Sequence, residues 1–147
     1  MRVHQLMKGR TSEVITIDTT STVSAAAHLL VRHGIGGLPV IGRDGRVAGF
    51  VAEREIVAAL DRHTEPIGPL PVERIMRRPV PTCSVDDPVA DIMARITRER
   101  LRHMVVLDGG RIVGIVSVGD IVKNRLEQLE METGVLRDYV AAQRAVD

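Results

Sequence analysis

At 147 residues, the chain is long enough to form one ordinary domain, or two very small ones, around a substantial core. Its 20 basic and 19 acidic residues give a net charge of +1, which provides no overall attraction for nucleic acid or an anionic membrane. The single cysteine excludes an internal disulfide, and the spacing of cysteine and histidines offers no zinc framework.

Two further features of the composition narrow the possible partners and location. No apolar run approaches the roughly 18 residues of a membrane span, and the first residues lack the apolar core of a signal peptide, so we expect a cytoplasmic protein. Phe50 and Tyr139 are the only aromatic residues, which leaves no stacking platform for single-stranded nucleic acid. Neither nucleic acid nor a membrane is therefore an expected partner.

The first part of the chain alternates predicted strands and helices. Residues 14–17 form a β-branched run that predicts a strand, and apolar residues at helical spacing predict a helix over 23–31. Strands at 37–41 and 46–51 are predicted to form a hairpin around residues 43–45. Because proline has no backbone N–H, Pro39 predicts an edge or an irregular point in the first of these strands. Residues 53–60 predict a second helix.

The segment 62–71 is the one convincing linker, because it carries three prolines and a glycine within six residues. Beyond it the pattern starts again. Residues 72–76 resemble residues 3–7, residues 80–82 resemble 14–16, residues 101–106 match 35–40, and residues 114–122 match 49–57. The sequence therefore contains a repeated strand-helix-strand-strand-helix unit of about 65 residues.

A unit of this length is too short to bury its own sheet comfortably, so the two copies are expected to pack together. We predict an α/β (α+β) fold of two βαββα units related by a pseudo-two-fold axis. The predicted organisation is a first unit over 1–62, a linker over 63–71, a second unit over 72–125 and a C-terminal helix over 126–147. The symmetry would create two equivalent clefts between the units, where small ligands usually bind.

Ser117 and Asp120 stand where the predicted strand ending near residue 117 breaks into a helix. Free backbone N–H groups at a helix N-terminus suit a phosphate, and a nearby carboxylate can accept two hydrogen bonds from a ribose diol. The same pair also matches a capping box, with Ser117 as the N-cap and Asp120 three residues later, which requires no ligand. The motif by itself leaves both interpretations open.

The C-terminal segment has apolar residues at steps of three and four, which predicts an amphipathic helix. Gly134 weakens this helix by about 1 kcal/mol relative to alanine. Because the polar face is acidic rather than basic, we favour a homodimer contact over a membrane-surface helix. The predicted seam consists of Leu126, Leu129, Thr133, Leu136 and Val140.

The duplicated unit, the short Met-containing lead-ins and the closing Gly-Ile-Val-Ser-x-x-Asp-Ile resemble a tandem pair of cystathionine-β-synthase (CBS) domains, also called a Bateman module. The resemblance covers about residues 3–125. The chain is also similar to small stand-alone bacterial CBS-pair proteins, whose second domain reads Arg-His-x-x-Val-x-x-Gly-Gly and ends in Ser-x-Gly-Asp-x-Val-Lys. In this sequence those motifs begin at Arg102 and Ser117.

The resemblance implies a regulatory module that binds adenosine-containing ligands (AMP, ADP, ATP, sometimes NAD or S-adenosylmethionine) between the units. By position, it implies that Asp120 holds the ribose hydroxyls and Ser117 a phosphate. The second domain also resembles the nucleotide-sensing subunit of AMP-activated kinase, which places Arg102 and His103 at phosphate. The adenine is expected against Val80, Thr82, Met104 and Val105. A homodimer that signals to an unknown effector protein is the expected assembly.

The first unit departs from this pattern. Ala52 and Glu55 replace the hydroxyl residue and the aspartate, and glycines replace the Arg-His pair. We therefore expect unequal sites, and the site built on the first unit should be the weaker one. Its predicted residues are Glu55, Arg54, Leu38, Pro39 and Thr16.

No enzyme motif emerges, so no catalytic residues, metal site or obligatory cofactor are predicted. Ser117 is not a nucleophile elbow because the residue two before it is Ile115 rather than glycine. Cys83 is expected to be a small buried residue rather than a catalytic thiol. The alternative function is a ligand-free protein–protein interaction or dimerisation module, in which Ser117 and Asp120 only cap a helix.

Overall fold

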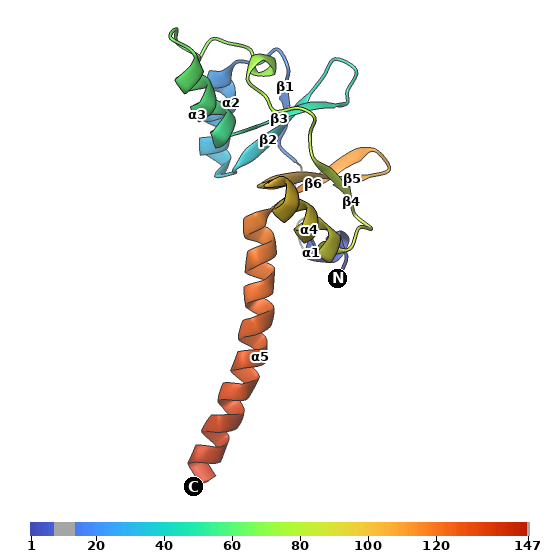
Figure 1. The fold of residues 1–147 in the computed structure, drawn as a ribbon, viewed down its shortest axis with the longest axis vertical. Helices are drawn as coiled ribbons and strands as arrows, with labels where there is room; N and C mark the ends of the chain where they lie inside the picture. The colour runs from blue at the N-terminus through green and yellow to red at the C-terminus, as the bar shows by residue number, and fades with distance from the viewer. Residues whose placement is uncertain (8–13, 147) are drawn as a thin grey trace.

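The computed structural model describes residues 1–7 and 14–146 and contains two three-stranded sheets (Figure 1). Each sheet carries its own helices in strand-helix-strand-strand-helix order, which confirms the predicted α/β fold of two repeated units. The elements of the first unit are β1 (Ile17–Asp18), α2 (Val23–His33), β2 (Gly37–Ile41), β3 (Val47–Ala52) and α3 (Glu53–Arg62). Those of the second are β4 (Thr82–Ser84), α4 (Val89–Glu99), β5 (His103–Asp108), β6 (Arg111–Ser117) and α5 (Val118–Val146).

The two sheets have the same topology. In each, the middle strand pairs in parallel with the first strand and antiparallel with the third, in the orders β1-β2-β3 and β4-β5-β6. Buried aliphatic residues fill a separate core in each unit, and a third cluster around Phe50, Ala52 and Val105 joins the two sheets. The repeat seen in the sequence is therefore a repeat of the fold.

Each unit is completed by a short segment that precedes the other unit in the sequence. Helix α1 (Val3–Leu6) lies beside α4 (Figure 1), where the Val3 N–H donates to the Asp87 carbonyl at 2.9 Å. The 3-10 helix η1 (Val72–Arg74) joins the first unit in the equivalent way, with the Val72 N–H donating to the Ser21 carbonyl at 2.8 Å. Val3 and Val72 are both fully buried. The lead-in segments are therefore exchanged between the units.

The predicted linker contributes to the first core. Ile67 is buried there and Leu70 packs against the same cluster. The backbone of this segment also accepts hydrogen bonds from the N-terminus of α2, because the Val23 N–H donates to the Leu70 carbonyl at 2.8 Å. The chain between α3 and η1 is thus held against the first unit along part of its length.

The first strand is shorter than predicted, because β1 has two paired residues and residues 14–16 lie outside it. Of the two alternatives predicted from Pro39, the edge strand is wrong, since β2 is the central strand of its sheet, whereas an irregular point is present as a register shift between Val40 and Ile41. In the second unit, the Val105 N–H donates to the Pro81 carbonyl at 2.9 Å, which extends the pairing of β4. Pro39 occupies the position equivalent to Val105 and has no N–H, so the matching bond to residue 15 cannot form.

Helix α5 runs from Val118 to Val146 without a break, so the segment expected to begin at 126 continues the helix that starts after Ser117. Its first turns pack on β6 and α4, and the rest projects away from both sheets (Figure 1). Across residues 1–7 and 14–146, no helix is both long enough and apolar enough to span a membrane.

Candidate ligand-binding site

A cleft of about 540 Å³ lies between the two units, and residues from both units form its walls. This volume falls within the range of small-molecule pockets, about 300–1,000 Å³. The second unit contributes the end of β6 and the start of α5, and the first contributes residues before β1 and β2. The described lining residues are Met7, Val14, Ile15, His33, Ile35, Gly36, Gly37, His103, Val113, Gly114, Ile115, Ser117 and Asp120.

Ser117 and Asp120 form a capping box at the wall of this first cleft. The Asp120 Oδ2 accepts hydrogen bonds from the Ser117 N–H and the Ser117 hydroxyl, both at 2.9 Å. The Asp120 N–H donates in return to the Ser117 Oγ at 3.1 Å. The capping interpretation is therefore confirmed, and it is compatible with a site, because both half-buried side chains also line the cleft.

His103 lies at the junction of the two units. Its ring packs on Phe50 with a centroid distance of 5.3 Å and a tilt of 37°. A Cβ on Gly36 would come within 3.0 Å of the His103 Nε2, and one on Gly37 would come within 2.5 Å of the Phe50 ring. The glycines therefore make room for both rings. Burial lowers the pKa of His103, and Arg102 adds to this effect, whereas Asp120 opposes it, so a neutral imidazole is favoured.

A second and much smaller cleft, of about 30 Å³, is also lined by His103. Glu55 is half-buried in it and accepts a hydrogen bond from the Ala52 N–H at 3.1 Å, which is half of the capping box because Ala52 has no hydroxyl. Burial raises the pKa of Glu55, against the lowering effects of the Ala52 N–H and the nearby arginines. The described lining residues are Phe50, Ala52, Arg54, Glu55, Arg77, Pro81, Arg102 and His103.

Comparison with known proteins identifies the repeated unit. The sequence profile of the CBS domain family matches residues 5–62 and 72–127, which together exceed half of the chain. The chain belongs to the CBS domain family. It is a tandem CBS pair, and solved structures of such proteins share its fold. One of them, a CBS-domain protein from Agrobacterium tumefaciens, is 31% identical with a TM-score of 0.79, covering 84% of this chain and 92% of its own.

Two further CBS structures similar to this chain were solved with adenosine compounds. A CBS domain protein from Pyrobaculum aerophilum in complex with AMP is 28% identical, with a TM-score of 0.75 and coverage of 90% of this chain and 99% of its own. A CBS domain pair in complex with 5-methylthioadenosine and S-adenosyl-L-methionine is 26% identical, with a TM-score of 0.76 and coverage of 87% and 98%.

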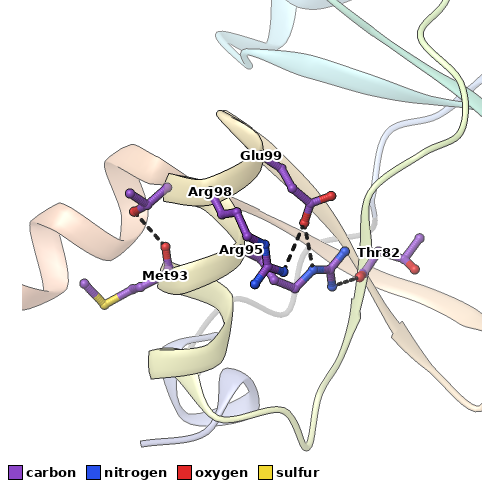
Figure 2. A network of polar contacts seen from close by, with 6 residues as sticks. Thr82, Met93, Arg95, Arg98 and Glu99 are labelled. Atoms are coloured by element: carbon purple, nitrogen blue, oxygen red, sulfur yellow. Dashed lines mark hydrogen bonds and ion pairs between the residues drawn. The ribbon is translucent and has the colours of Figure 1, made fainter.

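The residues predicted for the main site divide among several places in the CBS pair. Ser117, Asp120 and His103 line the first cleft, whereas Arg102 lines the second together with His103. Met104 and Val105 are buried in the core, and Val80 packs against the cluster that joins the sheets. The Thr82 carbonyl accepts a hydrogen bond from Arg95 of α4 at 2.8 Å (Figure 2). Their role as ligand contacts stays a prediction.

The residues predicted for the weaker site also separate. Glu55 and Arg54 line the second cleft. Leu38 and Pro39 are buried in the first unit, and Thr16 is exposed just before β1. These ligand contacts likewise stay a prediction.

Sequence reasoning missed the first-unit wall of the larger cleft. Val14, Ile15 and Ile35 face the Ser117–Asp120 turn, although they lie more than 80 residues before it in the sequence. In the smaller cleft, Pro81 of the second unit faces the Glu55 turn of the first. Because the units are related by a pseudo-two-fold axis, the turn between the last strand and the last helix of one unit lies opposite the residues that precede the first strand of the other. The sequence repeat could therefore have predicted that residues from both units line each cleft.

Cys83 is not among the described lining residues of either cleft. Cys83 is buried, as predicted, and burial raises the pKa of its thiol to about 11, so that it is protonated at neutral pH. Within residues 1–7 and 14–146, no group of three His, Cys, Asp or Glu side chains is arranged to hold a metal ion.

Proposed function

We propose that this CBS pair is a regulatory module that binds an adenosine-containing ligand, such as AMP, ADP, ATP or NAD, in the larger cleft. The observation that carries the proposal is the cleft itself, in which Ser117 and Asp120 face a first-unit wall across a volume of about 540 Å³. The two relatives whose structures contain AMP, or 5-methylthioadenosine and S-adenosyl-L-methionine, support an adenosine compound as the ligand.

Each part of an adenosine ligand has a chemically suitable group in this cleft. The Asp120 carboxylate can accept hydrogen bonds from the two ribose hydroxyls. The apolar side chains of Val14, Ile15 and Ile35 provide a surface for the adenine. The N-terminus of α5 suits a phosphate, to which the Ser117 hydroxyl can donate once it exchanges its bond to the Asp120 Oδ2 for one to the ligand. The neutral His103 ring can donate one further hydrogen bond.

The difference between the clefts favours one ligand for each chain. The smaller cleft, at about 30 Å³, has room for about one water molecule and not for a nucleoside. Pro39 offers a physical reason for the asymmetry, because it leaves residues 14–16 unpaired to β2, whereas Pro81 is held to β5. Residues 14 and 15, which form part of the wall of the larger cleft, are therefore not hydrogen-bonded to the first sheet as a strand.

A ligand between the units can act as a signal because it contacts both. It shifts the equilibrium toward the arrangement of the units that it binds more tightly. We propose that this shift is passed to an effector protein and that the module regulates rather than catalyses.

The test is calorimetric titration of AMP, ATP, NAD and S-adenosylmethionine into protein freed of co-purified small molecules. We expect one equivalent of at least one of these ligands to bind the wild type. Asp120→Asn should weaken that binding at least tenfold, about 1.4 kcal/mol, because the amide cannot accept from both hydroxyls as a carboxylate does. Glu55→Gln is the matched control, as it changes the equivalent residue of the smaller cleft and should leave the affinity unchanged.

The rival function is a ligand-free interaction module, favoured by the complete capping box of Ser117 and Asp120. In that case none of the four compounds binds, and Asp120→Asn changes only the thermal stability. Equal weakening by Asp120→Asn and Glu55→Gln would also refute the assignment of the ligand to the larger cleft.

A further inference from the structure

The projecting part of α5 carries an apolar stripe that its own chain leaves exposed. Val122, Leu126 and Leu129 are 49%, 52% and 42% exposed, although Ile121 beside them is buried against the second unit. Since successive helical residues are about 100° apart, the stripe lies roughly a quarter-turn or more away from the face that Ile121 buries. Beyond this point α5 extends away from both sheets (Figure 1), so the body of the chain does not cover the stripe.

The stripe continues through the sequence with the spacing of a coiled coil. Apolar or β-branched residues recur at alternating steps of four and three, which corresponds to positions a and d of a heptad. Gly134 falls at position b, outside this seam, and open space surrounds it. The a and d positions are Val122, Leu126, Leu129, Thr133, Leu136 and Val140.

A long helix needs such a partner. Isolated helices are marginally stable in water, and most helices in proteins are held by packing of an apolar face. α5 is 29 residues long, and its described packing partners are β6 and α4, which lie beside its first turns (Figure 1). A second helix along positions a and d would bury the stripe.

The charges that flank the seam identify a second copy of the chain as that partner. Between residues 125 and 137, position g is occupied by Arg125 and Glu132, and position e by Glu130 and, in the sequence, Arg137. In a parallel pair, each g residue lies near the following e residue of the other helix. Arg125 would then face Glu130 of the partner subunit, which joins opposite charges, and the sequence repeats this spacing of opposite charges at positions 132 and 137.

We propose that α5 forms a parallel two-stranded coiled coil with α5 of a second copy of this chain. This proposal specifies the contact surface of the expected homodimer and the relative direction of its two helices. The coiled coil does not depend on a ligand in the cleft. The two CBS pairs then lie at the same end of the coil, each with its larger cleft at the N-terminus of the paired helices.

Sedimentation equilibrium of the full chain tests the seam. The wild type should be a dimer, and Leu126→Asp should weaken dimerisation at least tenfold, because it places a charge in the seam of both helices. Met131→Asp is the matched control, because Met131 is equally apolar and 73% exposed but occupies position f outside the seam. A monomeric wild type, or a dimer that Leu126→Asp leaves intact, would overturn the proposal.

Charge exchange tests the orientation. Arg125→Glu should weaken the dimer, and the double variant Arg125→Glu/Glu130→Arg should restore it, since opposite charges then face each other again. Arg125→Glu/Glu132→Arg should not restore it. Rescue by Glu132→Arg instead of Glu130→Arg would show an antiparallel pair and refute the parallel one.

Ligand binding distinguishes this proposal from the proposed function. The larger cleft lies within a single chain, so Leu126→Asp should bind the adenosine ligand with the stoichiometry of the wild type. A wild-type dimer that binds none of the four compounds would support the coiled coil and refute the proposed ligand-binding function.

Discussion

His103 is the one side chain that lines both clefts among the described residues. Its ring is held between Phe50 and Gly36, so it cannot turn fully toward one cleft without changing its contacts at the other. The equivalent position in the first unit is Gly37, over which the Phe50 ring lies. A second large ring at the pseudo-two-fold axis would have no room. The loss of symmetry at this position is thus a consequence of packing.

The lowered pKa of His103 predicts a pH dependence of stability. As the pH falls through about 6.5, the unfolded chain protonates this histidine before the folded chain does. The free energy of unfolding should therefore decrease below pH 6.5, until the pH reaches the folded-state pKa. Chemical denaturation between pH 5 and 8 measures this, and His103→Gln should show a shallower decrease. An identical pH profile in the variant would mean that His103 does not contribute.

At the scale of the elements, each exchanged lead-in meets the opposite sheet at a glycine. The Met76 side chain and the Arg77 backbone, which follow η1, lie over Gly49 of β3, and Met7 after α1 lies over Gly114 of β6. A Cβ at Gly49 would contact the Met76 Sδ, come within 2.6 Å of its Cγ and lie 3.0 Å from the Arg77 carbonyl oxygen. At Gly114 it would meet mainly the terminal methyl of Met7. The two glycines occupy equivalent positions in the fold, but the atoms that a Cβ would meet can move aside more easily at Gly114 than at Gly49.

This difference predicts unequal effects of the same substitution. Gly49→Ala should lower the free energy of unfolding by about 1–3 kcal/mol, because the clash involves the inner part of a side chain and backbone. Gly114→Ala should cost clearly less, since the end of a flexible methionine can move aside. Denaturant titrations of both variants provide the comparison. A larger loss for Gly114→Ala would contradict this account.

At the scale of the whole molecule, the separate core of each unit is completed by residues that lie outside its five strands and helices. Val3 belongs to the core of the second unit, and Ile67, Val72 and Ile75 belong to that of the first. The core of the second unit is therefore incomplete without the N-terminal segment before the first unit, and the core of the first unit is incomplete without the segment after α3. The cluster of Phe50, Ala52 and Val105 then joins the two units. Separate folding of the two repeats is not expected.

We accordingly predict one cooperative unfolding transition for both sheets. Val3→Ala and Val72→Ala should each lower the stability of that common transition, by about 1–3 kcal/mol for the loss of fully buried methyl groups. The backbone amide NMR signals of Val40 and Val106 report on the two sheets, and they should disappear together as denaturant is added. Two separate midpoints, each sensitive to only one substitution, would refute this.

Much of this protein follows from the sequence by itself. The spacing of apolar residues predicts the repeated unit, because helix and strand periods are local properties of the chain. The capping box is likewise local, since Ser117 and Asp120 are three residues apart and meet whenever a helix begins between them. The heptad spacing of α5 is visible in the same way.

Only the tertiary structure decided which distant residues meet. Val14 and Ile15 line the cleft of the Ser117–Asp120 turn because the pseudo-two-fold packing brings the entry of one unit to the helix of the other. The hydrogen bond between Val105 and Pro81 has no counterpart at Pro39, and the space for the His103 ring depends on a glycine in the opposite unit. Contacts of this kind arise between segments far apart in the chain, where local periodicity carries no information about the partner.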